Sequence, residues 1–540
     1  MIIKDCFKDY NDKAISKVVP PEVTCRRVLK KLNNLAPSIL AYYIELRTQL
    51  DIPQIRVVGT DDYQAFARSM GQNGKGHSRT QALASGLMEL VERYSCGKYL
   101  KNGISLVSSF KNLELKGNPF RLEDILKYPR LTERKAKKEL ETAKISWYRG
   151  YTLEEEEVYI PMNLIRYLLE GSNGMASGNS FEEALLHGIC EVIERHFIAL
   201  IEERKIKTPF IDKTTVNLPA ARYLINKAEV LGQKIYIKDF SLGFGMPVIG
   251  VIRKTTRDTC TITVGVATDR DEALTRALTE NSQVQGNAEA TRKISLSGYH
   301  FLRNKSISMQ DIPNIADSNI RLEIERIKVL LRKQEMRAFF VIATDKILNI
   351  PCVYVYIPQC KFSFPRIEYR NIWMGLVLES LVVKDNAATR KYINKAGQND
   401  KANQAIYSFY RGIYLRQQLR YSEAIRSFLN AGKAINRMTH LEPVERVEIR
   451  SFAIANLVLC YQATGNTGKV IGYLLNLSEI NPCFSFKQLR SYFSAGLAAK
   501  ERKLFDKVFD LYQNVRALRG KIALKKAGSS LKVHKYLGTR

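Results

Sequence analysis

Two segments of the chain, roughly 100 residues apart, carry the same pattern of acidic and basic residues. Each contains a Glu-x-x-Glu-Arg sequence, at residues 89–93 and 191–195, and each follows an Asn-Gly pair. Because an α-helix turns by about 100° per residue, the polar residues of each segment fall on one face and the aliphatic residues on the other. The chain must therefore bury one side of two separate helices. The repeated stripe predicts two halves of one site and an ancient duplication.

The two stripes are rich in carboxylates. The first comprises Gln81, Ser85, Glu89 and Glu92, and the second comprises Asn179, Glu183, His187, Glu191 and Glu194. One such helix alone would be an ordinary surface helix with a solvated acidic face. Two such faces brought together would repel, and a hard divalent cation such as Mg²⁺ would relieve the repulsion. The adjacent arginines suit phosphate oxygens, and glycine-rich turns before helices suit anions, so the pattern favours a metal–nucleotide site.

The segment GQNGKGHS, residues 71–78, does not fit a Walker P-loop. The four-residue gap between its glycines is wrong for that motif, and no strand is evident ahead of it. The sequence also lacks a G-x-S-x-G elbow, an H-E-x-x-H pair and paired C-x-x-C motifs.

Both segments resemble the two signature helices of the YcaO family. The matching stretches are NGKGHSRTQALASGLMELVERYS and SNGMASGNSFEEALLHGICEVIER, with a third in DEALTRALTENSQ and a weaker one in PPEVTCRRV. The resemblance covers about residues 15–385. It implies an α+β fold, in which an ATP-binding catalytic domain is built from helices and mixed or antiparallel sheets. It also implies an enzyme that uses Mg-ATP to phosphorylate a peptide backbone amide oxygen before a nucleophile attacks the carbonyl.

The resemblance assigns roles by position and leaves the catalytic residue unknown. The implied metal and phosphate shell comprises Glu89, Glu92, Glu183, Glu191 and Glu194. The implied nucleotide-binding residues are Lys17, Thr24, Arg27, Ser85, Asn179, Arg195, Arg276, Glu280 and Gln283. Metal and arginine would stabilise the charge that moves during phosphoryl transfer.

The chain departs from the family pattern in two places. His196 stands where many members have Asp, either as a core residue or as a partner of the site. Azoline-forming members usually end in a proline-rich tail, whereas the last proline here is Pro482. Thioamide formation with a TfuA-like partner and a sulfur source is therefore favoured over cyclodehydration. The alternative is an ATP-binding accessory or scaffold protein for methylthiolation of a small-subunit ribosomal protein, beside a methylthiotransferase.

The composition indicates the cellular location of the protein and the class of its partners. No run of 18 apolar residues and no signal peptide occur, and the nine cysteines lack metal-binding spacing, so we expect a cytoplasmic protein with reduced thiols and no membrane contact. The net charge of +30 favours acidic partners such as RNA, the ribosome or an acidic leader peptide, or else reflects lysines spread over solvated surfaces.

The chain divides into four predicted parts: a YcaO-type domain at 1–385, a polar connector at 386–401, tetratricopeptide-like helical repeats at 402–516 and a basic tail at 517–540. Residues 1–50 look helical, and residues 234–254 look like an antiparallel strand pair. The repeats rest on loosely spaced residues such as Gly412, Ala424 and Phe428, with a plain helical bundle as the alternative. Such repeats bind protein segments or mediate dimers, and we expect a homodimer.

Overall fold

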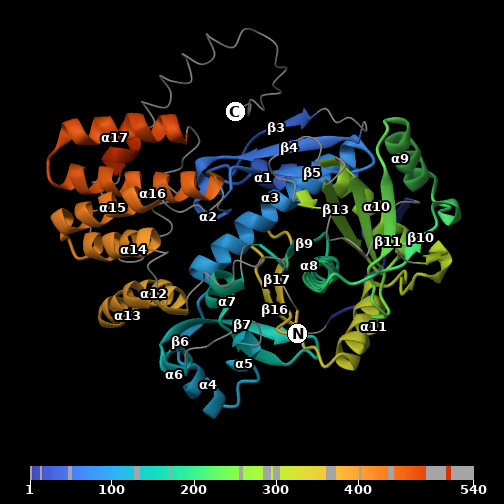
Figure 1. The fold of residues 1–540 in the computed structure, drawn as a ribbon, viewed down its shortest axis with the longest axis horizontal. Helices are drawn as coiled ribbons and strands as arrows, with labels where there is room; N and C mark the ends of the chain where they lie inside the picture. Colours follow the sequence, from blue (N-terminus) through green and yellow to red (C-terminus); the bar gives the residue numbers. More distant parts are fainter. Residues whose placement is uncertain are drawn as a thin grey trace, which may run out of the picture.

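The computed structural model describes residues 3–12, 15–46, 52–67, 69–126, 134–169, 172–254, 259–283, 293–295, 305–360, 372–399, 404–435, 443–481 and 506–512. They form an α+β assembly of sheets and long helices, joined to a stack of C-terminal helices that lies at the left of Figure 1. Among the described helices, none combines the length and apolar character that crossing a bilayer requires.

Three main sheets organise the α+β part (Figure 1). The first has the order β3-β4-β5, with β3 at Leu40–Leu46, β4 at Gln54–Gly59 and β5 at Gly71–Lys75. The second has the order β6-β7-β16-β17-β9, with β8 paired to β7; its strands are Leu106–Ser108, Ile145–Thr152, Phe339–Ile342, Cys352–Tyr356, Met175–Ser177 and Glu157–Ile160.

The third sheet has the order β14-β13-β12-β11-β10-β15. Its strands are Lys293–Ser295, Thr259–Val266, Val248–Lys254, Ile235–Asp239, Phe210–Ile211 and Ser306–Ile307. A short ribbon of β1 (Tyr10–Asp12) and β2 (Ile15–Lys17) stands apart. Pairings among the described strands are antiparallel except for β10 with β15.

Two 24-residue helices, α3 (Arg79–Asn102) and α8 (Phe181–Arg204), run through the middle of the molecule. The other helices of this part are α1 Pro21–Asn33, α2 Asp61–Ala67, α4 Phe110–Leu115, α5 Glu123–Leu126, α6 Arg134–Thr142, α7 Met162–Leu169, α9 Pro219–Val230, α10 Arg270–Gln283 and α11 Ile320–Lys333, with 3₁₀ turns at Lys213–Thr215 and Met309–Asp311. The aliphatic sides of α3 and α8 are buried as their periodicity predicts, including Leu87, Leu90 and Ile189.

The C-terminal helices are α12 Ile372–Val382, α13 Asn386–Asn399, α14 Gln404–Gln417, α15 Tyr421–Ile435, α16 Pro443–Ala463 and α17 Thr467–Ile480. Neighbouring helices pack as antiparallel pairs, and Gly412 of α14 lies against the Phe428 ring of α15, where a Cβ would approach ring carbons to 2.6 Å. The segment expected as a polar connector is mostly helix α13. The third predicted repeat falls largely outside the described residues.

The antiparallel strand pair predicted within residues 234–254 is confirmed as β11 and β12. The prediction that residues 1–50 are helical is wrong beyond α1, because the Leu40–Leu46 stretch pairs with β4 and places aromatic and β-branched side chains on a sheet. The absence of a strand before GQNGKGHS is also wrong. Gly71–Lys75 is strand β5, although its glycines and polar residues give no strand signal in the sequence.

A buried carboxyl in α12 makes folding depend on pH. Glu379 is fully buried, and its Oε2 accepts hydrogen bonds from the Ser146 backbone N–H at 2.9 Å and the Ser146 hydroxyl at 2.8 Å. Burial raises the pKa of Glu379 to about 7, and the Ser146 hydrogen bonds oppose the rise. This carboxyl therefore takes up a proton on folding, and its contribution to stability falls as pH rises from about 4.5 through 7.

We expect Glu379→Gln to unfold at a higher temperature than the wild type at pH 8, because the amide avoids burying a charge. At pH 5 the difference should vanish, since the wild-type carboxyl is then neutral. Thermal melts followed by circular dichroism at the two pH values measure this, with the exposed Glu114→Gln as a control. An equal difference at both pH values would contradict the assignment.

Candidate nucleotide and metal site

Three strand–turn–helix units of one design surround the site. In each, a strand leads through three residues into a helix: β5 into α3, β9 into α8 and β13 into α10. The last turn residue caps each helix. Ser78 accepts the Gln81 N–H at 3.1 Å, Ser180 accepts the Glu183 N–H at 3.0 Å, and Asp269 accepts the Asp271 N–H at 2.8 Å. A polar N-cap of this kind satisfies backbone donors that the helix leaves free.

The three units close into a ring. Helix α3 contacts β9, the strand of the second unit; α8 contacts β13, the strand of the third; and α10 contacts β5, the strand of the first. Glycines of β5 and β13 allow a helix to pack closely on the strand of its own unit. A Cβ on Gly74 would lie 2.0 Å from the Ala82 carbonyl oxygen of α3, and one on Gly265 would lie 2.1 Å from the Ala273 carbonyl oxygen of α10. The polar faces of the three helices therefore meet inside one ring.

The Glu-x-x-Glu-Arg faces of α3 and α8 come together in this ring. Arg93 of α3 forms ion pairs with Glu89 at 3.1 Å and Glu92 at 3.3 Å. Burial raises the pKa of Glu92 well above its ordinary value, and the nearby charges of Glu191 and Glu89 raise it further, while Arg93 opposes the rise. Carboxylates from the two helices are thus close enough to repel.

Glu191 of α8 is the counterpart of Glu89 in the repeated Glu-x-x-Glu-Arg pattern. Its Oε2 accepts the Gly174 N–H at 3.3 Å. Burial raises the pKa of Glu191 and the Glu194 charge adds to the rise, whereas Arg195 and Arg93 lower it. Glu194 lies 3.7 Å from the Arg195 guanidinium, whose Nε is buried without a hydrogen-bond partner among the described residues.

Glu183 belongs to a different part of the site. It lies eight residues before Glu191, about 12 Å along the helix axis, and is bound by the N-terminal segment. Its carboxylate accepts the Val18 N–H at 3.3 Å and the Asn179 side-chain N–H at 3.3 Å. Thr24 donates to Asn179 Oδ1 and Arg27 donates to the Asn179 carbonyl oxygen, each at 3.1 Å. The predicted residues Thr24, Arg27, Asn179 and Glu183 therefore form one cluster.

Positive charge gathers where α10 meets β5. Lys75, the last residue of β5, forms an ion pair with Glu280 of α10. Arg276, Lys17 and Lys75 all lie close enough to His187 to lower its pKa, which burial already lowers well below the ordinary value. The predicted residues Lys17, Arg276 and Glu280 thus meet around Lys75 and His187. Ser85 lies half-buried one turn before Glu89, and the side chain of Gln283 is outside the described part of the chain.

The donor set fits a divalent cation with a phosphate chain. Glu89, Glu92 and Glu191 form a carboxylate-rich end, where a hard cation would offset the burial and the like charges that raise the pKa values of Glu92 and Glu191. The Arg195 Nε–H lacks an acceptor and suits a phosphate oxygen. No three carboxylates, imidazoles or thiols among the described residues are already close enough to enclose a metal. Phosphate oxygens would therefore supply part of the coordination shell.

Sequence reasoning placed His187 on the polar face without a role, and it assigned no role to Lys75. The signal for Lys75 is its position in the NGKG turn, three residues before a helix cap. His196, by contrast, is buried and its ring packs against the Phe197 ring at 5.2 Å, in agreement with the core alternative. Cys96 and Cys190 are buried beside the two helices.

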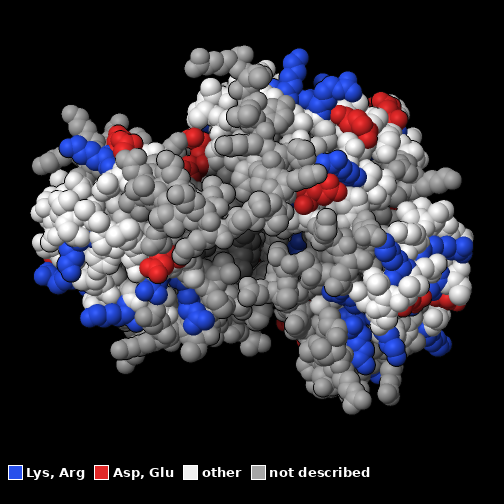
Figure 2. All heavy atoms as spheres, turned by 90° about the horizontal axis from the view of Figure 1, so that it is seen from above, with Lys and Arg blue, Asp and Glu red and all other residues white. Residues whose placement is uncertain are grey.

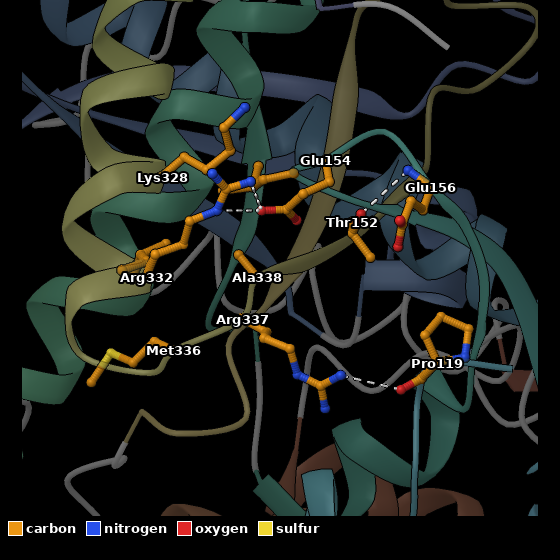
Figure 3. Close-up of a pocket in the computed structure, with 11 residues that line it drawn as sticks. Pro119, Thr152, Glu154, Glu156, Lys328, Arg332, Met336, Arg337 and Ala338 are labelled. Carbon is orange, nitrogen blue, oxygen red and sulfur yellow. Dashed lines mark hydrogen bonds and ion pairs between the residues drawn. The ribbon is translucent and has the colours of Figure 1, made fainter.

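A separate pocket of about 340 Å³ lies between the β7–β8 turn and α11 (Figure 3). Its charged residues are largely paired: Arg332 with Glu154 at 2.9 Å, and Arg337 with Asp124 at 2.6 Å and the Pro119 carbonyl oxygen at 3.3 Å. None of the predicted site residues lines it. In the β7–β8 turn, Glu154 forms an ion pair with Arg332 and Glu155 accepts the Ile3 N–H.

The family model described as "YcaO cyclodehydratase, ATP- and Mg²⁺-binding" matches residues 73–361, which include the three units except for Gly71 and Gln72 of β5. The chain belongs to the YcaO family. ATP and Mg²⁺ are the cofactors by which that family is described. YcaO from Methanopyrus kandleri bound with AMPPCP and Mg²⁺ has the same fold, with a TM-score of 0.51, 20% identity and coverage of 67% of this chain and 95% of that one.

Two relatives have names that refer to different biological contexts. The ribosomal protein S12 methylthiotransferase accessory factor of Escherichia coli is 37% identical over 135 residues, which is 25% of this chain and 23% of that protein. An uncharacterized protein in the tfuA 3′ region of Rhizobium leguminosarum is 23% identical over 337 residues, 58% of this chain and 76% of that protein. The match with the accessory factor therefore spans about a quarter of its length.

Proposed function

We propose that this YcaO protein activates a peptide backbone amide with ATP and Mg²⁺ and converts it to a thioamide. The observation that carries the proposal is the meeting of two acidic helical faces. Burial and the charges of Glu191 and Glu89 raise the pKa of Glu92, and burial and the charge of Glu194 raise the pKa of Glu191. Such a cluster is stable at neutral pH when a cation neutralises it. The cationic side around Lys75 and Arg276 complements the phosphate chain that such a cation carries.

The chemistry balances with sulfide as co-reactant. The amide oxygen attacks the γ-phosphorus of ATP and ADP leaves. Hydrosulfide adds to the activated carbon, and the original oxygen leaves with the phosphate, giving C=S and hydrogen phosphate, which carries the proton that hydrosulfide brought. A bound magnesium ion would stabilise the charge on the transferring phosphoryl group. Arg195 and Arg276 would hold phosphate oxygens, and Glu89, Glu92 and Glu191 would hold the cation. Thr24, Arg27 and Asn179 would bind the nucleotide beside them.

The relative from the tfuA 3′ region supports sulfur transfer, since its match extends over most of its length. We assign the helical pairs from α14 onward to binding of the protein partner or peptide. The test uses full-length protein with Mg-ATP, sulfide, a TfuA-like partner and a library of candidate peptides. The expected product is about 16 Da heavier, by exchange of oxygen for sulfur, and its formation requires ATP. Loss of about 18 Da as water would instead identify a cyclodehydratase.

The second candidate is an accessory factor that binds ATP while acting on ribosomal protein methylthiolation, and the Escherichia coli relative favours it. The net charge of +30 is compatible with a ribosome partner. On the face seen in Figure 2, described Lys and Arg side chains are spread among Asp and Glu. This candidate predicts ATP binding without peptide modification, and ribosome cosedimentation that weakens steeply with salt.

A further inference from the structure

The ring of three units contains an internal correspondence. Counting from the N-caps Ser78, Ser180 and Asp269, position eleven is glutamate in every helix, and the three residues are Glu89, Glu191 and Glu280. Position seven is Ser85 in α3, His187 in α8 and Arg276 in α10. Position fourteen is Glu92, Glu194 and Gln283 in the same order. Glu280 therefore holds the place in the third unit that the two central carboxylates hold in the others.

In two of the units the strand residue three places before the cap makes an equivalent contact. Ser177 of β9 donates its hydroxyl hydrogen to the Met88 carbonyl oxygen of α3, at 3.0 Å. Lys75 of β5 reaches the corresponding part of α10, where it pairs with Glu280. The strand of each of these units thus touches the helix of the preceding unit next to position eleven. At that point the first unit presents an ammonium group to the interior of the ring.

Lys75 is surrounded by charges from all three helices. Glu280 and Arg276 face it from α10, Glu194, Arg195 and His187 from α8, and Glu89 from α3. Its side chain is only 23% exposed, and burial lowers its pKa to about 7, with Arg276 and Arg195 lowering it further and Glu194 and Glu89 opposing. Lys75, Arg276 and Arg195 thus bring three cationic groups to one side of the ring, where a phosphate group placed between them would accept charge-assisted hydrogen bonds.

We infer that Lys75 is a phosphate-binding residue of this site, and that Glu280 holds its ammonium group until the phosphate chain arrives. This inference rests on the proposed function, because it concerns the same ATP site. The structure brings the Lys75 ammonium beside the guanidinium groups that the phosphate chain would contact. Transfer of the ammonium group from Glu280 to phosphate frees that carboxylate, which stands at the position that Glu89 and Glu191 hold in the other two units.

The test measures binding of Mg-ATP, magnesium tripolyphosphate and adenosine by calorimetry with full-length Lys75→Met and Lys75→Arg. Lys75→Met should weaken binding of both phosphate compounds about 10- to 100-fold and leave adenosine binding unchanged. Lys75→Arg should restore much of the loss. Lys98→Met is the matched control, since Lys98 is 26% exposed and pairs with Asp345 at 2.6 Å, outside the ring.

Proton linkage separates phosphate binding from a structural role. At pH 8 Lys75 is mostly neutral, and phosphate favours its charged form, so tripolyphosphate binding should take up close to one proton, seen as a dependence of the heat on buffer ionisation. Lys75→Met should abolish this uptake. Uptake that persists in Lys75→Met would place the proton elsewhere, on His187 for example, and would overturn the inference, as would unchanged tripolyphosphate affinity. Failure of the wild type to bind Mg-ATP would instead refute the proposed function.

Discussion

Glu191→Gln is expected to lower the rate of ATP-dependent peptide modification at least about 100-fold and to leave the fold intact. The amide keeps the shape of the side chain and can still accept the Gly174 N–H, but it removes one charge from the carboxylate-rich end of the ring. Binding of a divalent cation depends on the negative charge of this carboxylate. The bound cation in turn stabilises the charge that develops during phosphoryl transfer. Rates from product mass spectrometry and Mg-ATP affinity from calorimetry should both fall.

The same substitution should raise the temperature of unfolding. The folded-state pKa of Glu191 is raised, so the ionised carboxylate costs stability at neutral pH, and that cost disappears as pH falls and the group protonates. A neutral amide avoids it at every pH. The control is Glu114→Gln, which removes an exposed carboxylate 56% accessible to solvent. A variant that retains full activity, or that is less stable than the wild type at pH 7, would contradict this account of the site.

Arg93→Met is expected to destabilise the protein by about 3–5 kcal/mol, because it removes one partner of a buried ion-pair network. Arg93 holds Glu89 and Glu92 together and also donates to the Ser172 carbonyl oxygen at 3.3 Å. Without the guanidinium, the enclosed carboxylates of Glu89 and Glu92 face Glu191 with little positive charge to offset their repulsion. Thermal unfolding gives the measurement, and Arg149→Met, at an exposed pair with Glu157, provides the control.

Two rescues identify the cause of the Arg93 effect. Addition of Glu92→Gln should recover part of the stability, since it removes the carboxylate whose pKa burial raises most clearly. Millimolar Mg²⁺ should recover more stability in Arg93→Met than the same ionic strength of NaCl, because a divalent cation can take the place of the lost charge. Equal effects of the two salts would show that the carboxylates do not bind the metal.

The helical faces were predictable because their signal is local. Apolar residues such as Leu87 and Ile189 recur at helical spacing, and the paired Glu-x-x-Glu-Arg sequences mark the opposite face. The β11–β12 region was predictable for a similar reason, as its strands are rich in β-branched residues on either side of a glycine-containing turn. In contrast, β5 is built from Gly71, Gln72, Asn73, Gly74 and Lys75, and becomes a strand because it pairs with β4 and lies against α3. No property of those five residues predicts that pairing.

The site was only partly predictable for the same physical reason. Spacing places Glu183 and Glu191 on one helix face, but it does not reveal that the N-terminal segment binds Glu183 about 12 Å from the other carboxylates. The role of Lys75 depends on contact between β5 and α10, which are separated by about 200 residues. The correspondence of Glu280 with Glu89 and Glu191 is present in the sequence at fixed distances from three helix caps. It becomes visible once the caps themselves are located.

The N-terminal segment has a consequence for how the protein is made. Its partners lie far along the chain: the Lys4 N–H donates to Glu182, the Val18 N–H to Glu183, the Cys6 N–H to Asn319, and Lys8 pairs with the buried Glu323 at 2.7 Å. A growing polypeptide therefore cannot complete the packing of its N-terminal segment until more than 300 residues have emerged from the ribosome. Such long-range closure slows folding, and activity should appear only late in synthesis, when most of the enzyme already exists.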